Sequence, residues 1–461
     1  MSTRQRRYEI RKREILQDTE IMPQVTEGML KRLEQFAEPF VATFVRRDSK
    51  ANIQIYLGGL LSDVDRKNVE SIAYRHDRQR GGLQYFIGQS PWPHHPLQQE
   101  LARHVGKELG EDDGVIGFDP SGFEKCGTES VGVQRQWLGR LGKVDNGQVG
   151  VYLAYASRKE YALVDERLYL PKSWANDKKR RKKCGVPKEI RYQTRHELAL
   201  DMLEGNRELL PHQWITGDDE MGRSSRFRRD LRGLGEQYLL AVPSDTGVRD
   251  LEIAPPAYSG RGAPAKQPFM RVERWRAAVA EKDWTRVDVR DGEKGPLVTE
   301  LVKRRVLART ERGKEGGAEE LLVVTRTRES NGTMKYDYYL SNASAQTALD
   351  ELARVIKAGH RIEDCFKRAK SEAGLADYEV RTWMGWHHHQ ILSLIALWFL
   401  VLETRRGKKI HSGVDGSPSS YALGRYAASC LQPHRSRVVS THDRTQKQTT
   451  RNRSVLLLQT T

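Results

Sequence analysis

Apolar residues recur at helical spacing at two places in the first 110 residues. The two runs are Met29, Leu33, Phe36 and Phe40, and then Leu97, Leu101, Val105 and Leu109. Because this spacing places apolar side chains on one helix face, residues 1–110 are predicted to form a helical region. The proline-rich residues 91–96 are predicted to form a loop, since proline lacks an amide donor and restricts its predecessor.

After Gly114 the pattern changes to short apolar runs bounded by Gly, Asn, Asp or Ser, which is typical of strands. Strands are predicted at 115–118, 130–133, 149–156, 213–217 and 237–242, and helices at 195–205 and 225–233. Strands that alternate with helices indicate a mixed α/β layer. We therefore assign residues 111–242 to an α/β core.

A β-rich segment follows this core. Residues 243–268 are rich in Pro, Gly and Ala and predict a boundary loop. Strands are predicted at 286–289, 298–308, 321–327 and 333–340, and Asn331-Gly332 predicts a hairpin between the last two. Residues 243–342 are thus predicted to be a β-rich insertion domain.

Helical spacing resumes after the insertion. One helix is predicted from an N-cap at Ser344 to Ala369, and a second, apolar helix from Trp386 to Glu403. We assign residues 343–402 to the C-terminal helices of the core. Residues 403–461 are basic, polar and poor in periodic apolar positions, which predicts a flexible tail.

The charge of the chain narrows the class of partner. The sequence has 78 Lys and Arg against 61 Asp and Glu, a formal net charge of +17. Such a surplus favours a polyanion such as nucleic acid through phosphate contacts, although many basic proteins never bind one. The longest apolar run, 391–402, is too short to span a bilayer, so we expect a cytoplasmic protein without a membrane partner.

Three carboxylates stand at positions that suit metal-dependent chemistry. Asp119 and Asp218 each follow an apolar strand, Asp119 just before a predicted turn at 120–122. If the strands are neighbours, both carboxylates emerge at the same sheet edge. Glu363 shares a helix face with Lys367 and Lys370.

Taken singly, each carboxylate is more typical of a turn, a helix cap or a solvated ion pair. Together the three could hold two divalent ions that activate a hydroxyl and stabilise a leaving oxygen in phosphodiester chemistry. A set of oxygen ligands without His or Cys favours Mg²⁺ or Mn²⁺ over zinc.

Several segments resemble the DDE transposases of bacterial insertion sequences, in particular families four and seven hundred and one. The matching segments, in family order, are 117–123, 130–136, 141–146, 148–151, 170–174, 180–181, 185–187, Asp218 with Gly222, 378–381 and 385–387. The resemblance implies an RNase H-like mixed sheet with flanking helices, split by a β-rich insertion between the second Asp and the Glu. It also implies cleavage at element ends and strand transfer into target DNA.

Carried over to this chain, the resemblance makes Asp119, Asp218 and Glu363 the catalytic, metal-binding residues, with Asp219 as an alternative to Asp218. The family's helix signature, Tyr-x2-Arg-x3-Glu-x6-Lys, is matched at Glu363 and Lys370. Ile356 and Gly359 stand where its Tyr and Arg are expected.

Basic and aromatic residues complete the predicted site. We expect DNA contacts from Lys370, Lys367, Arg361, Arg180, Arg181 and Trp284. Arg180 and Arg181 lie in a basic run, 178–183, that is equally typical of a solvated loop. Core packing is the alternative for Trp284 and for Trp275.

The predicted partners are the element's double-stranded terminal repeats and target DNA, bound by at least a dimer. Two rival functions remain open. One is a DNA-binding protein of the same fold that does not cut, and the other is a related nuclease that cuts but never joins.

Overall fold

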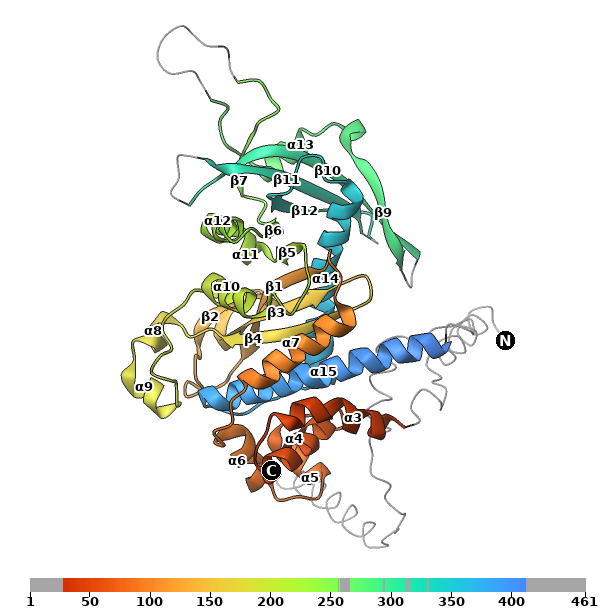
Figure 1. Cartoon of the computed structure of the whole chain (residues 1–461). Coiled ribbons are helices and arrows are strands. Elements are labelled where there is room, and N and C mark those ends of the chain that lie inside the picture. The colour runs from red at the N-terminus through yellow and green to blue at the C-terminus, as the bar shows by residue number, and fades with distance from the viewer. Residues whose placement is uncertain are drawn as a thin grey trace, which may run out of the picture.

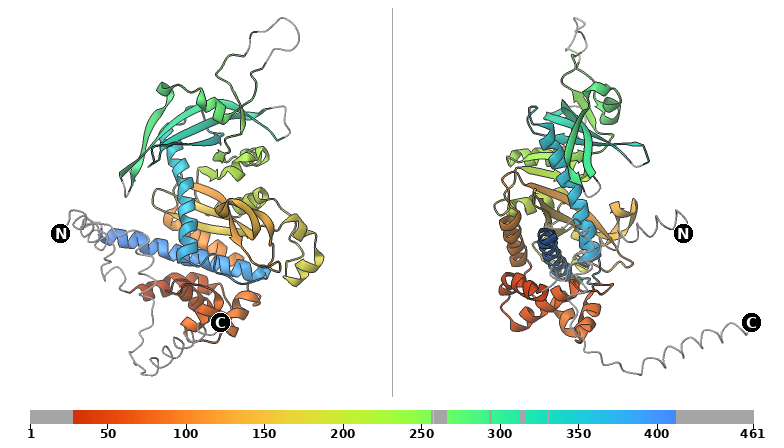
Figure 2. Two further views of the ribbon diagram at one scale, coloured as in Figure 1. Left: turned by 180° about the vertical axis from the view of Figure 1, so that it is seen from behind. Right: turned by 90° about the vertical axis from the view of Figure 1, so that its right-hand side faces the viewer.

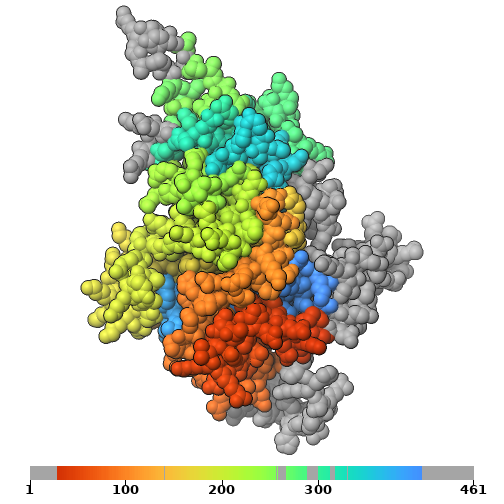
Figure 3. Space-filling model, viewed as in Figure 1, coloured from red at the N-terminus to blue at the C-terminus, as the bar shows by residue number. Residues whose placement is uncertain are grey.

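A computed structural model describes residues 28–255, 257, 266–292, 295–311, 316–329 and 331–411, so parts of the predicted N-terminal region and tail lie outside it. Its N-terminal part is helical, as predicted. The helices are α3 (Met29–Ala42), α4 (Arg47–Leu60), α5 (Val69–Arg75), α6 (Arg80–Gly88) and α7 (His95–Leu109). Helices α3 to α6 lie at one end of the elongated molecule in Figure 3, and residues of the insertion lie toward the other end.

Six strands and their connecting helices form the core. The strands are β1 (Val115–Glu124), β2 (Gln134–Leu138), β3 (Lys143–Ala156), β4 (Tyr161–Leu168), β5 (Trp214–Gly217) and β6 (Gln237–Val242). The helices are α8 (Lys172–Ala175), α9 (Lys178–Lys183), α10 (Arg195–Asn206), α11 (Asp219–Arg223) and α12 (Ser225–Gly233), with a short 3-10 turn, η1 (Gly139–Leu141), between β2 and β3.

The strand order confirms the predicted mixed α/β fold. β3 is antiparallel to β1 and to β4, whereas β1, β5 and β6 are parallel to one another. The order β4-β3-β1-β5-β6 with these directions is that of an RNase H-like sheet (Figure 1). Parallel neighbours need crossover connections, and here α8 to α10 connect β4 to β5 and α11 and α12 connect β5 to β6.

Three details of the core differ from the sequence prediction. β1 continues through the predicted turn at 120–122, because β3 pairs with it as far as Glu124. The pairing of β1 with β5 ends at Phe118, so Pro120 need not donate a hydrogen bond to β5. The predicted strand at 130–133 is absent from the described structure, and the strand begins instead at Gln134. β4 was not predicted.

The insertion contributes seven further elements. These are β7 (Gly247–Asp250), β8 (Met270–Arg271), α13 (Val272–Ala277), β9 (Thr285–Gly292), β10 (Gly295–Arg309), β11 (Gly316–Arg328) and β12 (Met334–Ser341), with a 3-10 turn, η2 (Glu281–Asp283), before β9. The four long strands and the turn at Gly332, with φ 87°, match the prediction. The expected loop at 243–268 contains β7, because Val248 is buried in the insertion's apolar cluster.

The insertion extends the core sheet. β12 pairs antiparallel with β6, and Leu340 lies opposite Leu240. The buried Glu320 of β11 accepts hydrogen bonds from Arg228 of α12 (2.8 Å) and from the Tyr238 hydroxyl of β6 (2.6 Å). One hydrogen-bonded sheet therefore runs from β2 to β8.

Two long helices complete the fold. α14 (Leu349–Glu372) runs from the insertion past the core sheet to α15 (Trp383–His411), as Figure 2 shows. α14 begins after Ala348 and not after the predicted cap Ser344. α15 continues beyond Glu403, where we expected the tail to begin, and Glu403 is held there by Arg32 (2.6 Å) and Arg406 (3.3 Å).

The N-terminal helices pack on α14 and α15. The Lys67 ammonium donates to the carbonyls of Leu60, Ser62 and Glu372 at 2.6–2.9 Å, which joins the α4–α5 connection to the end of α14. The His388 ring of α15 stacks on Trp92, with ring centroids 3.4 Å apart. Among the described helices, none is both long and apolar enough to cross a membrane.

Candidate active site

The strand register places the first two predicted carboxylates side by side. β1 and β5 are parallel, with Gly117 opposite Thr216 and Phe118 opposite Gly217. The next residue on each strand is Asp119 and Asp218. Since side chains alternate along a strand, Asp119 points to the same face of the sheet as Gly117.

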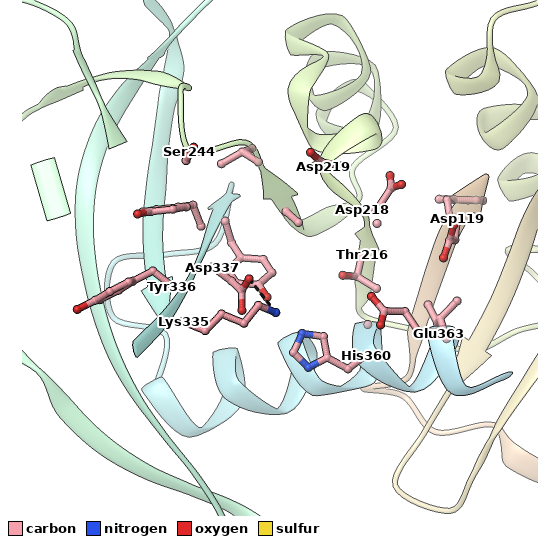
Figure 4. Close-up of a pocket in the computed structure, with 18 residues that line it drawn as sticks. Asp119, Thr216, Asp218, Asp219, Ser244, Lys335, Tyr336, Asp337, His360 and Glu363 are labelled. Carbon is pink, nitrogen blue, oxygen red and sulfur yellow. Dashed lines mark ion pairs between the residues drawn. The ribbon is translucent and has the colours of Figure 1, made fainter. Parts of the chain in front are cut away.

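Close packing of α14 brings the third carboxylate to this face. A Cβ atom at Gly117 would collide with Cδ1 of Ile362, so only glycine lets the helix approach β1 so closely. Glu363 is the next residue of α14. Asp119, Asp218 and Glu363 therefore line one cavity of about 370 Å³, which we call the carboxylate pocket (Figure 4).

The Asp119 carboxyl lies in an unfavourable electrostatic environment. Burial raises its pKa well above the ordinary value, and the negative charges of Asp218 and Glu363 raise it further. The positive charge of Lys370 lowers this pKa and so acts in the opposite direction. The pocket thus concentrates negative charge that a bound cation would offset.

Asp218 has two roles that its sequence position suggested as alternatives. Its Oδ1 accepts a hydrogen bond from the Met221 amide (3.0 Å) and caps α11, while the residue also lines the carboxylate pocket. Burial raises the pKa of Asp218 to about 7, the Met221 amide lowers it, and Glu220 and Asp219 raise it. Asp219, the alternative ligand, is exposed and lines the same pocket.

The carboxylate oxygens of the carboxylate pocket suit a divalent ion, but the three side chains do not converge on one point. Among the described residues, no group of three or more His, Cys, Asp or Glu side chains is close enough to hold a metal as it stands. Glu363 is exposed on α14, and its flexible side chain can turn toward the two strand carboxylates. Carboxylate oxygens and surplus negative charge fit Mg²⁺ or Mn²⁺.

The insertion supplies a wall of the carboxylate pocket that sequence reasoning missed. Lys335, Tyr336 and Asp337 of β12 line it opposite the carboxylates, with His360 of α14 between them (Figure 4). Lys335 forms an ion pair with Asp337 (3.3 Å). The sequence contained no signal for these residues, because the pairing of β12 with β6 brings them to the site.

The three basic residues predicted on α14 occupy different environments. Lys370 donates a hydrogen bond to the Ser121 hydroxyl (2.8 Å), two residues along β1 from Asp119, and its ammonium lies 5.2 Å from the Phe123 ring centroid. Lys367 is exposed. Arg361 instead donates to the Ser157 carbonyl (3.0 Å) at the end of β3.

The predicted basic run is a short helix, α9, and not a loop. Arg181 donates to the carbonyls of Ala175, Pro187 and Ile190 at 2.8–3.2 Å. Arg180 donates to the Thr128 carbonyl (3.0 Å), and its guanidinium lies 3.7 Å from the Trp174 ring centroid. Both arginines thus hold loops of the protein itself.

The two tryptophans singled out in the insertion contact other residues of the insertion. Trp284 packs against Tyr336 and lies 4.5 Å from the Arg326 guanidinium. Trp275 is buried and donates to Asp250 (2.8 Å). Ile356, in the position of the family's Tyr, is buried in the core.

Gly359, in the position of the family's Arg, lies against Thr216 of β5. It lines the carboxylate pocket but has no side chain that could contact a phosphate.

Comparison with known proteins identifies the family. A family model described as "DDE superfamily endonuclease" matches residues 39–296, which is more than half of the chain. The chain belongs to the DDE superfamily of endonucleases. The matched span of this DDE endonuclease contains Asp119 and Asp218, whereas Glu363 lies beyond it.

Individual relatives are more distant. The DDE endonuclease is 28% identical over 133 residues to a protein of Microchaete diplosiphon named "Probable transposase for insertion sequence element IS701". The match covers 28% of this chain and 35% of that protein's length. A solved structure of the piggyBac transposase synaptic complex with hairpin DNA was also matched. The alignment covers 93% of this chain and 83% of the piggyBac chain, with 9% sequence identity and a TM-score of 0.38.

Proposed function

We propose that this DDE endonuclease is a transposase that cuts DNA at the ends of an insertion sequence and joins the freed ends to target DNA. The observation that carries the proposal is the position of Asp119, Asp218 and Glu363, which come from three separate elements and line one pocket. The unfavourable charge around Asp119 supports the same role, because perturbed carboxylates in a cleft are typical of functional sites.

In this proposal Asp119, Asp218 and Glu363 hold divalent ions, which when bound activate the attacking oxygen and stabilise the leaving one. The Asp218 oxygen that does not cap α11 remains available as a ligand. Lys370, fixed beside Asp119 through Ser121, positions a DNA phosphate near the carboxylates. Such chemistry depends on positioning and charge neutralisation more than on covalent steps at the protein.

One residue of the insertion and one of α14 compensate for the absent arginine at Gly359. Lys335 and His360 line the same carboxylate pocket and provide side chains that can donate hydrogen bonds to phosphate oxygens. The DNA is double-stranded, and two copies of the chain hold the two ends of the element. The protein acts in the cytoplasm, where bacterial DNA lies.

The direct test is cleavage of a duplex that carries the element's own end, with Mg²⁺ or Mn²⁺ and with EDTA as the metal-free control. The native protein should cut at the element boundary, and Asp119→Ala, Asp218→Ala and Glu363→Ala should bind the duplex without cutting it. Pre-cut ends should then be joined to a plasmid. Cleavage by all three variants would overturn the assignment of these residues. Cleavage without joining would show that the protein is a nuclease that does not transfer strands.

A DNA-binding protein that does not cut is the second candidate. It is favoured by the buried Ile356 and the small Gly359 at positions where the family has DNA-contacting side chains, and by carboxylates that are not closed around one point. Binding of the end duplex without cleavage by the native protein, in either metal, would establish this function instead.

A further inference from the structure

An exposed tryptophan, Trp137, lines a cavity to which Asp218 and Asp219 also contribute. Trp137 of β2 is 55% exposed, which is unusual for so large an apolar side chain. Its cross-strand neighbour Val144 is also half exposed, at 50%. Core packing therefore does not account for this indole.

Trp137 lines a second cavity, of about 320 Å³, which we call the tryptophan pocket. Its other walls come from β1, η1, β3, α10, α11 and the residues before α11; they are Pro120, Gly122, Gly139, Val149, Arg195, Asp218, Asp219, Glu220 and Arg223. Asp218 and Asp219 line both cavities, so the two pockets adjoin. A DNA strand held at the carboxylates therefore has its neighbouring nucleotide within reach of Trp137.

The tryptophan pocket combines an aromatic surface, free space and positive charge. Apart from its two chain neighbours, no described atom lies within 4 Å of the point where a Gly139 Cβ would be. Arg223 is exposed, and its guanidinium has no hydrogen-bond or ion-pair partner among the residues that the structure describes. Arg195, by contrast, is fixed by Glu220 (2.6 Å) and Gln136 (3.3 Å).

A flat ring beside an unpartnered guanidinium matches one nucleotide. Bases outside a duplex stack on aromatic side chains, and the phosphate between stacked bases binds arginine. The chemistry of the tryptophan pocket therefore fits a nucleic-acid strand.

We propose that Trp137 stacks on an unpaired base of the nucleotide next to the scissile phosphodiester, while Arg223 binds that nucleotide's phosphate. The inference rests on the proposed function, since it places the cleaved bond at the carboxylates. It adds a DNA-positioning site formed by β2 and α11, separate from the insertion.

Photocrosslinking locates this contact directly. End duplexes carry 5-iodouracil at each nucleotide flanking the cleavage site in turn, and the crosslinked peptide is identified by mass spectrometry. The native protein should crosslink through Trp137 at one of these nucleotides. Trp137→Phe should retain base binding, whereas Val144→Ala, which alters the cross-strand partner outside the pocket, should crosslink as the native protein does.

Cleavage kinetics test whether the contact acts on the base. Trp137→Ala should slow cleavage about five- to a hundredfold, the range expected for loss of one stacked base. An abasic site at the crosslinked position should slow the native protein to a similar extent and should slow Trp137→Ala little further. Thermal unfolding verifies that Trp137→Ala is folded, as its exposure predicts.

Two results would overturn the inference. One is equal cleavage by native protein, Trp137→Ala and Trp137→Phe with no crosslink to Trp137. The other is a Trp137→Ala variant that changes self-association in sedimentation but not DNA crosslinking, which would make the indole a contact between copies of the chain. Asp119→Ala separates this outcome from failure of the proposed function, because it should still crosslink through Trp137 while it no longer cuts.

Discussion

The carboxylate pocket and helix α9 are both rich in charge, but the structure uses their charges in opposite ways. Arg180 and Arg181 of α9 direct their guanidinium groups to backbone carbonyls of nearby loops. In the carboxylate pocket, Asp119 lies near two further carboxylates, whose negative charges raise its pKa, and Lys370 acts in the opposite direction. Charges with protein partners stabilise the fold, whereas like charges held close together are typical of a functional site.

The largest expected effect concerns the approach of α14 to the sheet. Gly117→Ala should destabilise the protein by about 2 kcal/mol, because the new Cβ overlaps Ile362. It should also slow cleavage about a hundredfold, since displacement of Glu363 by even 1 Å misplaces the reacting groups. Thermal unfolding and cleavage rates measure both effects.

Gly205→Ala in α10 is the matched control, because nothing lies within 4 Å of its added Cβ. It should leave both quantities unchanged or raise stability slightly. If Gly117→Ala behaved like this control, the packing of Ile362 on β1 would not position Glu363.

The second effect tests the structural role of α9. Arg181→Met should lower the free energy of unfolding by about 1–3 kcal/mol, because it leaves the carbonyls of Ala175, Pro187 and Ile190 without their donor. Denaturant unfolding measures the loss. If the Arg181→Met protein were as stable as the native one but unable to bind DNA, Arg181 would be a DNA contact and not a stabilising residue.

The third effect concerns stability in the carboxylate pocket. Without metal, Asp119→Asn should raise the free energy of unfolding by about 1 kcal/mol, because it removes a buried charge from its like-charged neighbours. Added Mn²⁺ should raise the melting temperature of the native protein but not of this variant. Asp112→Asn, in the exposed loop before β1, is the control. A destabilised Asp119→Asn protein would show that the carboxylate stabilises the fold.

The smallest effect concerns an exposed lysine of α9. Lys182→Gln should leave stability within about 0.5 kcal/mol of native. If α9 lies along DNA, the variant should weaken duplex binding a fewfold and reduce the slope of log affinity against log salt by about 1. An unchanged salt slope would show that Lys182 of α9 does not contact DNA.

Local pattern predicted the elements that matter most for the site. The apolar runs that end at Asp119 and Asp218 became the parallel neighbours β1 and β5, because buried parallel strands are apolar on both faces. Helical periodicity likewise placed Glu363 beside the buried Ile362. These features depend on residues close in sequence.

The features that could not be predicted depend on long-range contacts. The wall of Lys335, Tyr336 and Asp337 exists because β12 pairs with β6, almost a hundred residues away. The carbonyl partners of Arg181 lie at the end of α8 and in the loop after α9, and no periodic pattern in the sequence indicates these contacts. The strand at 115–124 is also longer than the predicted strand at 115–118, because pairing with β3 outweighs the local turn preference of Pro120.

Iron-mediated cleavage of the protein chain tests most directly whether the three carboxylates hold a metal. Ferrous ion in place of Mg²⁺, with ascorbate and peroxide, generates radicals that cut the backbone next to the bound ion. We expect cuts beside Asp119, Asp218 and Glu363, and we expect excess Mg²⁺ to suppress them and Asp119→Asn to abolish them. Cuts elsewhere in the chain, or the same cuts in Asp119→Asn, would contradict it.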